Sequence, residues 1–451
     1  MRSTHPPPRD IHPGTACRPT VIVAGLSVRG LAESARRAGW QVLALDAFGD
    51  LDTRRASAGW WPIAADGDEP AAPRIDATRL LAALLAAMAE RPRQSPLLGW
   101  VAGSGFEAQP DLLDRAAQVL PLLGMGTADI AALRQPRPCF GMLADLGIDH
   151  PEVAFEPPPG EGWLVKDMAS SGGQAVCRWS PGRCPTQVAD GPDHPLTRYW
   201  QREAAGRSLG CLLLARQHDF RLIGVHEHLV DPTDEAPFRH AGMVGPTRLS
   251  EGQLATLQAA LQRLVVAFRL RGLVSVDWLL DGDRWLLLEV NPRPSASLTV
   301  HERRLARTAP CSLLAGHVAQ FLPNDPHASV GLDATGPITT RADAGTAALT
   351  PCGGERIVVA PVPLRIDAPT LERWAASTHT HDIPSAPIDL PAGAPILSVS
   401  ADGPDVSAVK RALDQRHAAV LRALRPDGTD DATSPTHPTP SSLDALAAEA
   451  L

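Results

Sequence analysis

The chain has 451 residues, of which 44% are hydrophobic, and its net charge is −8 with no basic block. This length suggests two to four domains, and the composition is that of a globular protein able to bury real cores. Nucleic acids and anionic membranes attract clustered Lys and Arg side chains, so neither is expected as a partner.

The sequence also lacks the features of a secreted or membrane protein. Residues 1–19 are rich in Pro, His and Arg, have no apolar stretch that could act as a signal peptide, and are expected to be disordered. The most apolar helical stretch, residues 80–89, is about half the length needed to cross a bilayer. Seven scattered cysteines without a CxxC pair argue against a disulfide framework or a zinc site. We therefore expect a cytoplasmic protein.

The first domain is expected over residues 20–124, where strands and helices alternate. Apolar runs predict strands at Thr20–Ala24, Gln41–Asp46 and 98–102, and helical periodicity appears at 31–38 and 80–89. Alternating strands and helices are typical of a parallel sheet with crossover connections.

The pattern changes near residue 124, and a second domain is expected over 125–325. It should contain helices at 139–146 and 251–268, and strands at Trp163–Asp167, 175–179, 211–215, 222–225, 273–280 and 284–290. A β-rich C-terminal domain is expected over 326–425, with strands at 356–361 and 395–400 and a helix at 406–424. Residues 426–451 are expected to form a flexible tail.

The strongest chemical signal is a hairpin that carries oxygen-bearing side chains. Asp277 lies on its first strand, Glu289 and Asn291 lie on its second, and Asp281-Gly282-Asp283 forms the turn. Residues two apart on a strand share a face, so the three side chains should meet and could hold Mg²⁺ together with substrate phosphates. Acids in a hairpin often simply face water, but an unpaired charge within the apolar run around Glu289 would be costly. Arg293 continues the same periodicity and could bind a carboxylate or a phosphoryl group.

A second signal lies in residues 162–176, where a strand carries Lys166 near its end. It is followed by the small-residue loop Ser170-Ser171-Gly172-Gly173. Glycine lets backbone amides approach phosphate oxygens, and the lysine ammonium can neutralise them. The loop is not a Walker A motif, because no GK[ST] precedes a helix. Taken alone, it would be interpreted as a surface turn. The chain has only two lysines against forty arginines, so Lys166 stands where its shape matters.

Residues 199–209 offer a third and weaker signal. They are interpreted as a strand edge followed by a turn at Gly206, where an adenine could pair with backbone groups. An ordinary connector between domains is the alternative.

In this order and at these distances, the three segments resemble the ATP-grasp superfamily, most closely its biotin carboxylase and purine-biosynthesis branch. The resemblance covers roughly residues 20–325 and implies a parallel α/β pre-grasp domain, a two-subdomain α+β grasp core and a small β-rich C-terminal domain. It also implies ATP as cosubstrate and Mg²⁺ as the metal, with Mn²⁺ as an alternative.

The resemblance assigns a role to each matching residue. Lys166 would bind phosphate, Ser171, Gly172 and Gly173 would form the phosphate loop, and Asp277, Glu289 and Asn291 would bind the metal. Gln201 would occupy the adenine hinge together with the backbones of Arg202 and Ala204. Arg293 would contact the substrate and the γ-phosphate.

Three positions depart from the family pattern. The family usually has another lysine before the helix that ends near Gly147, and the nearest candidate here is Arg137. The acidic residue often used for the ribose corresponds to Ser208. Asp277 replaces a more frequent Glu but keeps a hard oxygen ligand.

Further segments are candidates for the acceptor site. The sequence GSGFE at 103–107 ends a strand where a cleft should open. In the grasp core, His226 and His228 alternate on one predicted strand, and Arg239 and His240 follow in a loop. A lone His is more often structural. The sequence GLSVRG at 25–30 lacks GxGxxG and is interpreted as an ordinary strand–turn–helix. Asp382-Ile383-Pro384 and Gly393-Ala394-Pro395 look like parts of the C-terminal domain.

The function expected from this resemblance is an ATP- and Mg²⁺-dependent carboxylate–amine ligase that acts through an acylphosphate. The whole chain also looks like predicted ATP-dependent carboligases related to biotin carboxylase, some of which are associated with cofactors of one-carbon metabolism. The alternatives are a bicarbonate-activating carboxylase, a phosphotransferase and a nucleotide-binding regulatory protein. The partners would be small-molecule carboxylates and amines, and the sequence leaves a homodimer open.

Overall fold

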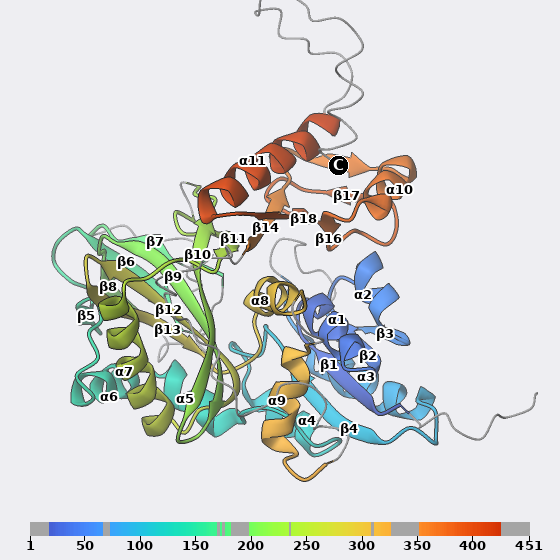
Figure 1. Cartoon of the computed structure of the whole chain (residues 1–451), viewed down its shortest axis with the longest axis horizontal. Coiled ribbons are helices and arrows are strands. Elements are labelled where there is room, and N and C mark those ends of the chain that lie inside the picture. Colours follow the sequence, from blue (N-terminus) through green and yellow to red (C-terminus); the bar gives the residue numbers. More distant parts are fainter. Residues whose placement is uncertain are drawn as a thin grey trace, which may run out of the picture.

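We analysed a computed structural model of the chain, which describes residues 18–65, 73–168, 172–173, 176–181, 198–233, 236–307, 311–325 and 351–424. The expected tail at 426–451, the boundary at 326 and all but two residues of the expected N-terminal segment lie outside these ranges. In Figure 1 the N-terminal domain, the central domain and the C-terminal domain surround α8. No helix in the described ranges combines the length and the apolar character of a membrane span.

The N-terminal domain is built on a parallel sheet in the order β3-β2-β1-β4. Both faces of the sheet are buried, since alternate residues of the strands enter two separate apolar cores, as expected for a parallel sheet. The three predicted strands are confirmed, whereas α2, β3 and α4 were not predicted. The elements are β1 (Thr20–Ala24), α1 (Arg29–Arg37), β2 (Gln41–Asp46), α2 (Leu51–Ala56), β3 (Gly59–Pro62), α3 (Ala77–Glu90), β4 (Leu97–Ala102) and α4 (Asp111–Ala117).

Two helices and a small antiparallel sheet form the first part of the central domain. The sheet has the order β5-β8-β6-β7, and β7 covers only two residues of the strand expected at 175–179. The elements are α5 (Thr127–Arg134), α6 (Pro136–Asp145), β5 (Val153–Ala154), β6 (Trp163–Asp167), β7 (Cys177–Arg178) and β8 (Arg198–Arg202).

The second part of the central domain belongs to an eight-stranded sheet with the order β13-β12-β9-β10-β11-β14-β18-β16. Helix α7 starts with a capping box between Ser250 and Gln253 and packs its leucines into the core under this sheet. The elements are β9 (Arg207–Arg216), β10 (Phe220–Val230), β11 (His240–Gly245), α7 (Glu251–Ala267), β12 (Arg271–Asp281), β13 (Arg284–Asn291), α8 (Ser297–Leu305) and α9 (Leu313–Phe321).

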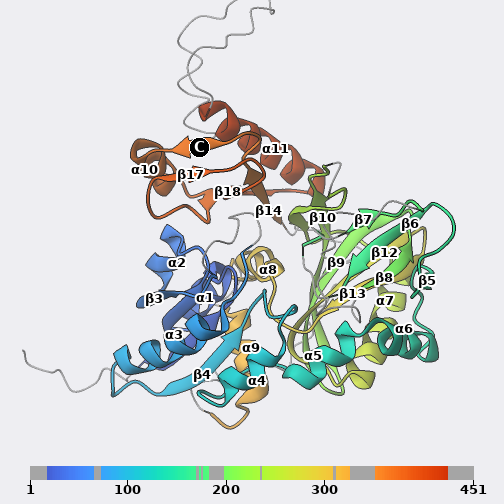
Figure 2. The same ribbon diagram turned by 180° about the vertical axis from the view of Figure 1, so that it is seen from behind.

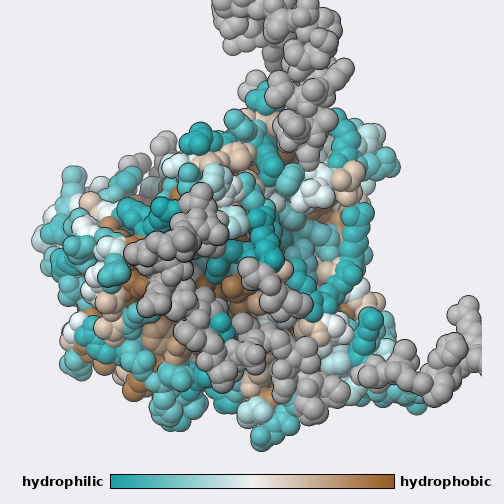
Figure 3. Space-filling view, in the orientation of Figure 1, coloured by the Kyte–Doolittle hydropathy of each residue, from teal (hydrophilic) through white to brown (hydrophobic). Residues whose placement is uncertain are grey.

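The C-terminal region continues this sheet, because β14 pairs with β11 in antiparallel register. In Figures 1 and 2 it lies above both α2 and the end of β10. Hydrophilic residues cover most of the coloured face in Figure 3. The region contains β14 (Cys352–Val359), β15 (Leu364–Ile366), α10 (Ala368–Ala376), β16 (Thr380–His381), β17 (Ile388–Leu390), β18 (Pro395–Gly403) and α11 (Val406–Ala423).

Candidate functional site

The hairpin of β12 and β13 brings together the three predicted metal ligands. Asp277 lies directly opposite Glu289 across the strand pair, and Asn291 is two residues further along β13. The Asn291 amide nitrogen lies 3.5 Å from Asp277 Oδ2. Burial alone would raise the pKa of Asp277, but His228, His240 and Arg293 hold it below its ordinary value. The hairpin thus presents two carboxylates and one amide from neighbouring positions on its surface.

Lys166 faces these side chains from the small sheet. Its ammonium donates a hydrogen bond to Gln201 Oε1 at 3.1 Å. Burial lowers the pKa of Lys166, while the nearby charges of Glu289 and Asp277 oppose this shift. The charges of Lys166 and of the two carboxylates therefore attract one another across the space between the two sheets. The sequence analysis expected this lysine and these acids to serve the same site.

Arg134 is a member of this cluster that the sequence analysis missed. It is the last residue of α5 and only 4% exposed. Its guanidinium donates to Glu289 Oε1 at 2.6 Å, to Asn291 Oδ1 at 2.7 Å and to the Met168 carbonyl at 2.8 Å. Its Nε atom is buried and has no hydrogen-bond partner among the described residues. Arg134 thus fixes two of the three hairpin side chains.

Arg293 connects the hairpin to the N-terminal domain. Its guanidinium forms a buried ion pair with Glu107, the last residue of the GSGFE segment after β4. Burial would raise the pKa of Glu107, but Arg293, Arg134 and nearby backbone N–H groups, including that of Gly105, lower it to about 2. Gly105 has φ +106°, and a Cβ there would lie 2.6 Å from Leu26, so this close turn requires glycine. We call Lys166, Arg134, Arg293, Asp277, Glu289 and Asn291 the hairpin site.

Comparison with known proteins identifies the domain that carries this site. Residues 138–297 match the family model described as an ATP-grasp domain. These residues belong to the ATP-grasp family. The fold of almost the whole chain is similar to solved ATP-grasp structures, although sequence identity is low.

Three of these structures show the extent of the likeness. An L-amino acid ligase from Bacillus licheniformis has a TM-score of 0.60 at 13% identity, covering 89% of this chain and 98% of that one. A carboxyaminoimidazole ribonucleotide synthase from Aspergillus clavatus, complexed with ATP, has a TM-score of 0.59 at 16% identity, with 90% and 99% covered. A biotin carboxylase from Campylobacter jejuni has a TM-score of 0.61 at 11% identity, with 90% and 91% covered. The predicted combination of α/β and α+β parts in an ATP-grasp fold is thereby confirmed.

The expected hinge of the ATP-grasp domain lies at the end of β8. Gln201 is 1% exposed, and its Nε2 atom has no partner in the described part of the chain. The Arg202 amide donates to the Glu152 carbonyl at 2.8 Å, and its guanidinium lies over the Trp163 ring. The Ala204 amide donates no hydrogen bond to any described residue, which leaves it available to a ligand. Ser208 lies on β9 opposite Leu279.

The predicted phosphate loop is described only at Gly172 and Gly173, and Ser171 lies outside the described residues. The Gly172 carbonyl accepts a hydrogen bond from the His240 amide at 3.0 Å. Gly173 has φ +70°, and a Cβ there would lie 2.2 Å from the Phe238 carbonyl oxygen. The loop therefore contacts the segment between β10 and β11, and only glycine fits at position 173.

Arg137 does not join the hairpin site. Its side chain is 66% exposed on α6, and it pairs at 3.2 Å with Glu156, which is itself 85% exposed. Arg134 and Arg137 belong to different helices, because α5 ends at Arg134 and α6 begins at Pro136. In this structure the basic side chain that approaches the cluster from these helices is therefore Arg134.

Several imidazoles border Asp277 on the large sheet. His228 Nε2 lies 3.2 Å from Asp277 Oδ1, while the His226 ring contacts His228 and His301. Burial lowers the pKa of His226 well below its ordinary value and that of His240 to about 4, so both rings are neutral near pH 7. A Cβ at Gly210 would lie 2.4 Å from His226 Nε2, so glycine makes room for these rings. The fourth predicted candidate, Arg239, pairs with Asp231 instead.

Proposed function

We propose that the chain is an ATP-dependent carboxylate–amine ligase whose hairpin site binds the phosphates of ATP. The observation that carries this proposal is the convergence of three cations, Lys166, Arg134 and Arg293, on a hairpin that presents two carboxylates and an amide. Such an arrangement suits a polyanionic substrate held jointly with a metal ion.

The side chains of the hairpin site fit a magnesium ion. Asp277, Glu289 and Asn291 supply hard oxygen donors from adjacent positions. A magnesium ion held there would neutralise charge on the phosphates, and Mn²⁺ is the alternative ion. Asn291 Oδ1 and one oxygen of Glu289 already accept hydrogen bonds from Arg134, so this guanidinium would have to turn when a metal ion binds.

The remaining residues account for binding and orientation. Lys166 would neutralise a phosphate from the small sheet. The Gln201 Nε2 and Ala204 N–H groups, which have no partner among the described residues, would be available to an adenine. Arg293, held by Glu107, would orient the acid substrate, so that the carboxylate attacks the γ-phosphorus of ATP and ADP leaves. The amine would then attack the acylphosphate carbonyl and release phosphate. Exclusion of water by the closed site would protect this intermediate.

The test measures ADP and phosphate release for pairs of candidate acids and amines, starting with glutamate, other amino acids, and pterin and furan precursors. Amine-dependent ADP release supports the ligase, and a pterin or furan acceptor would place it in one-carbon cofactor synthesis. Bicarbonate dependence would indicate a carboxylase, and ATP binding without turnover a regulatory protein; either result would refute the ligase.

The two lysines of the chain provide a matched pair of variants. Lys166→Met should reduce turnover by about 10²-fold or more, because it removes a phosphate contact. Lys410→Met should leave turnover unchanged, since Lys410 lies on α11 and pairs with Glu227 at 2.8 Å. Equal activity of the two variants would contradict the assignment of Lys166.

A further inference from the structure

A second cluster of acids lies between the N-terminal domain and the C-terminal region. Its centre is Arg29, the first residue of α1, which is 5% exposed. Arg29 pairs closely with Glu355 of β14 at 2.9 Å and with Asp382 at 2.7 Å. Arg303 makes a second contact with Glu355 at 3.2 Å. The two guanidinium groups thus compensate these two carboxylates.

Two neighbouring acids share Arg29 with Glu355 and Asp382, and form only long ion pairs with it. Glu33 and Asp52 lie 3.8 Å and 3.6 Å from Arg29 nitrogens, beyond hydrogen-bond distance. Asp52 Oδ2 accepts the Asp382 amide at 2.7 Å, but its Oδ1 is buried and has no partner among the described residues. A buried carboxylate oxygen without a donor is energetically unfavourable, so this arrangement calls for a ligand.

Asp50 provides an independent observation of the same kind. It is only 7% exposed, and its side chain does not cap α2. Within the described ranges its carboxylate has no hydrogen-bond partner and no ion-pair partner, while its backbone carbonyl accepts a hydrogen bond from the Arg54 amide. Burial and the nearby carboxylates of Asp382, Asp46 and Asp52 raise the pKa of Asp50 well above its ordinary value, and the charge of Arg29 opposes this shift only in part. Asp46 is already satisfied by the Gly49 amide and the Trp60 indole, so Asp50 has no donor to share. In this cluster the carboxylates therefore outnumber the two guanidinium groups, Arg29 and Arg303, that interact with them.

Three side chains converge at this point with the chemistry of metal ligands. One ligand atom each from Glu33, Asp52 and His381 lie within 4.8 Å of one another. They come from α1, α2 and β16, and we call Glu33, Asp50, Asp52 and His381 the junction site. His381 Nε2 lies 2.9 Å from the Ser400 hydroxyl, which leaves Nδ1 for a ligand. The side chains of Glu33 and Asp52 are 28% and 18% exposed, so an ion could reach them from solvent.

We propose that the junction site binds one divalent transition-metal ion through Glu33, Asp52 and His381, with Asp50 balancing its charge from beside it. Two carboxylates and one imidazole suit Zn²⁺ or Mn²⁺. The ion would fasten α1 and α2 to β16, and so hold the N-terminal domain against the C-terminal region. This site shares no residue with the hairpin site, and the inference does not depend on the proposed ligase activity.

The test measures bound metal in the full chain after dialysis against Zn²⁺ or Mn²⁺. Asp277→Asn and Glu289→Gln together remove both carboxylate ligands proposed for the hairpin site and leave only amide oxygens there, so one equivalent should remain. Adding Glu33→Gln and Asp52→Asn should remove it, with at least tenfold weaker binding. If the combined variant does not fold, comparing the wild type with the Glu33/Asp52 variant should show the same loss of one equivalent.

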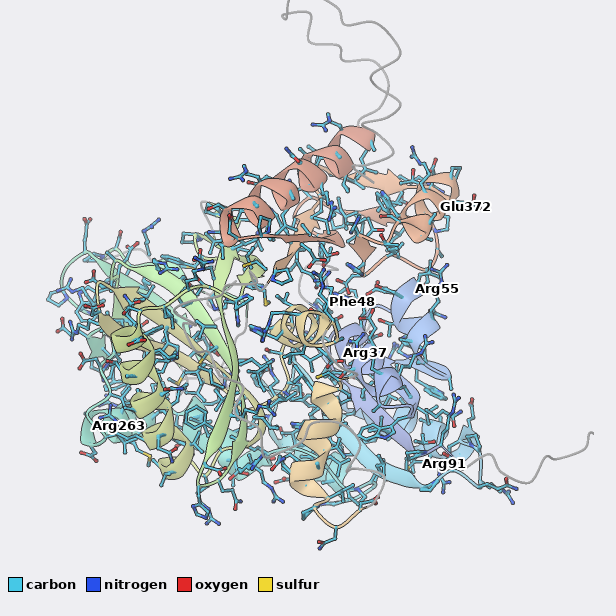
Figure 4. All side chains as sticks on the ribbon, viewed as in Figure 1. Arg37, Phe48, Arg55, Arg91, Arg263 and Glu372 are labelled. Carbon is cyan, nitrogen blue, oxygen red and sulfur yellow. The ribbon has the colours of Figure 1, made fainter. Side chains whose placement is uncertain are left out.

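Thermal unfolding distinguishes a metal site from a structural role of these acids. The Glu33/Asp52 amide variant should unfold at a higher temperature than the wild type without metal, because like charges are removed, and should not respond to added metal. Glu372→Gln, at an exposed position of α10 (Figure 4), is the matched control and should respond like the wild type. Three results would overturn the proposal. The first is an unchanged metal content in the Glu33/Asp52 variant, and the second is a Tm of this variant below that of the wild type without metal. The third is that the organic cation methylammonium stabilises the wild type while neither Zn²⁺ nor Mn²⁺ does.

Discussion

The hairpin site and the junction site both gather acids between domains, but they balance charge differently. In the hairpin site, Glu289 pairs with Arg134, and Asp277 contacts His228. In the junction site, the Asp50 carboxylate has no hydrogen-bond or ion-pair partner in the described parts of the chain. Asp52 Oδ1 is buried and accepts no hydrogen bond from a described residue. A cluster that balances its own charge can be ordered before its ligand arrives, whereas an unbalanced cluster depends on a cation from outside. The following predictions test this contrast.

The largest effect is expected from Glu289→Gln in the hairpin site. The substitution removes a proposed metal ligand and the charge opposite Arg134 and Lys166, so ADP formation should fall about 10²–10³-fold. Steady-state kinetics at saturating Mg²⁺ would measure this. Asp283→Asn, at an exposed position in the turn of the same hairpin, is the control and should retain full activity. A Glu289 variant as active as this control would remove the hairpin from the mechanism.

Arg134→Met should destabilise the fold by about 1–3 kcal/mol, because it removes the hydrogen-bonded partner of Glu289, which is 33% exposed and keeps the charge of Lys166 nearby. Urea unfolding would measure the change. The matched variant Arg137→Met removes an exposed pair and should have little effect. If both variants lost the same stability, the buried pairing of Arg134 would not be the source of the effect.

Glu107→Gln should cost about 3 kcal/mol of stability near pH 7, because the pKa of Glu107 is lowered to about 2 in the folded protein. This contribution is present above the ordinary pKa of a glutamate and is lost as the pH falls toward 2. The stability difference between wild type and variant should therefore shrink between about pH 5 and pH 2, as measured by urea unfolding at several pH values. A constant difference would mean that the effect comes from packing.

The smallest effect, with the opposite sign, is expected at Asp50. Asp50→Asn should stabilise the metal-free protein by on the order of 1 kcal/mol, since it removes a carboxylate whose charged form is disfavoured by burial and by Asp382, Asp46 and Asp52, and its side chain makes no described hydrogen bond. Unfolding in the presence of EDTA would measure the change. A destabilised variant would show that the Asp50 carboxylate makes a stabilising interaction, and the two sites would then not differ in charge balance as described.

The sequence predicts much of the fold because local patterns determine it. The strands at Thr20–Ala24 and Gln41–Asp46 follow from apolar runs, and the β12–β13 hairpin follows from its turn. The pairing of β11 with β14 was not predicted. Strand partners more than 100 residues apart leave no periodic signal, because the same apolar pattern fits many neighbours.

The residues of the candidate site that lie close together in sequence were predicted, because local patterns determine their positions. The hairpin fixes Asp277, Glu289 and Asn291 locally, and the structure brings Lys166 to them. Arg134 was missed because its role depends on where α5 ends. The available signal was Pro136, two residues after Arg134 and the preceding stretch ADIAAL. A proline can begin a new helix but disfavours helical geometry in the residue before it, so one helix should end near Arg134 and another should begin at Pro136.

Strand β11 pairs with β10 on one edge and with β14 on the other, which affects how a shortened chain would behave. Gly242 has φ +135°, and a Cβ there would lie 2.1 Å from the Glu355 carbonyl oxygen, so the strands meet too closely for any side chain. A fragment that ended at residue 325 would expose the N–H and C=O groups of β11 along a bare edge. Such an edge invites strands from other molecules, so the ATP-grasp portion expressed alone should self-associate. Strand β14 thus covers the edge of the central sheet that β11 would otherwise expose.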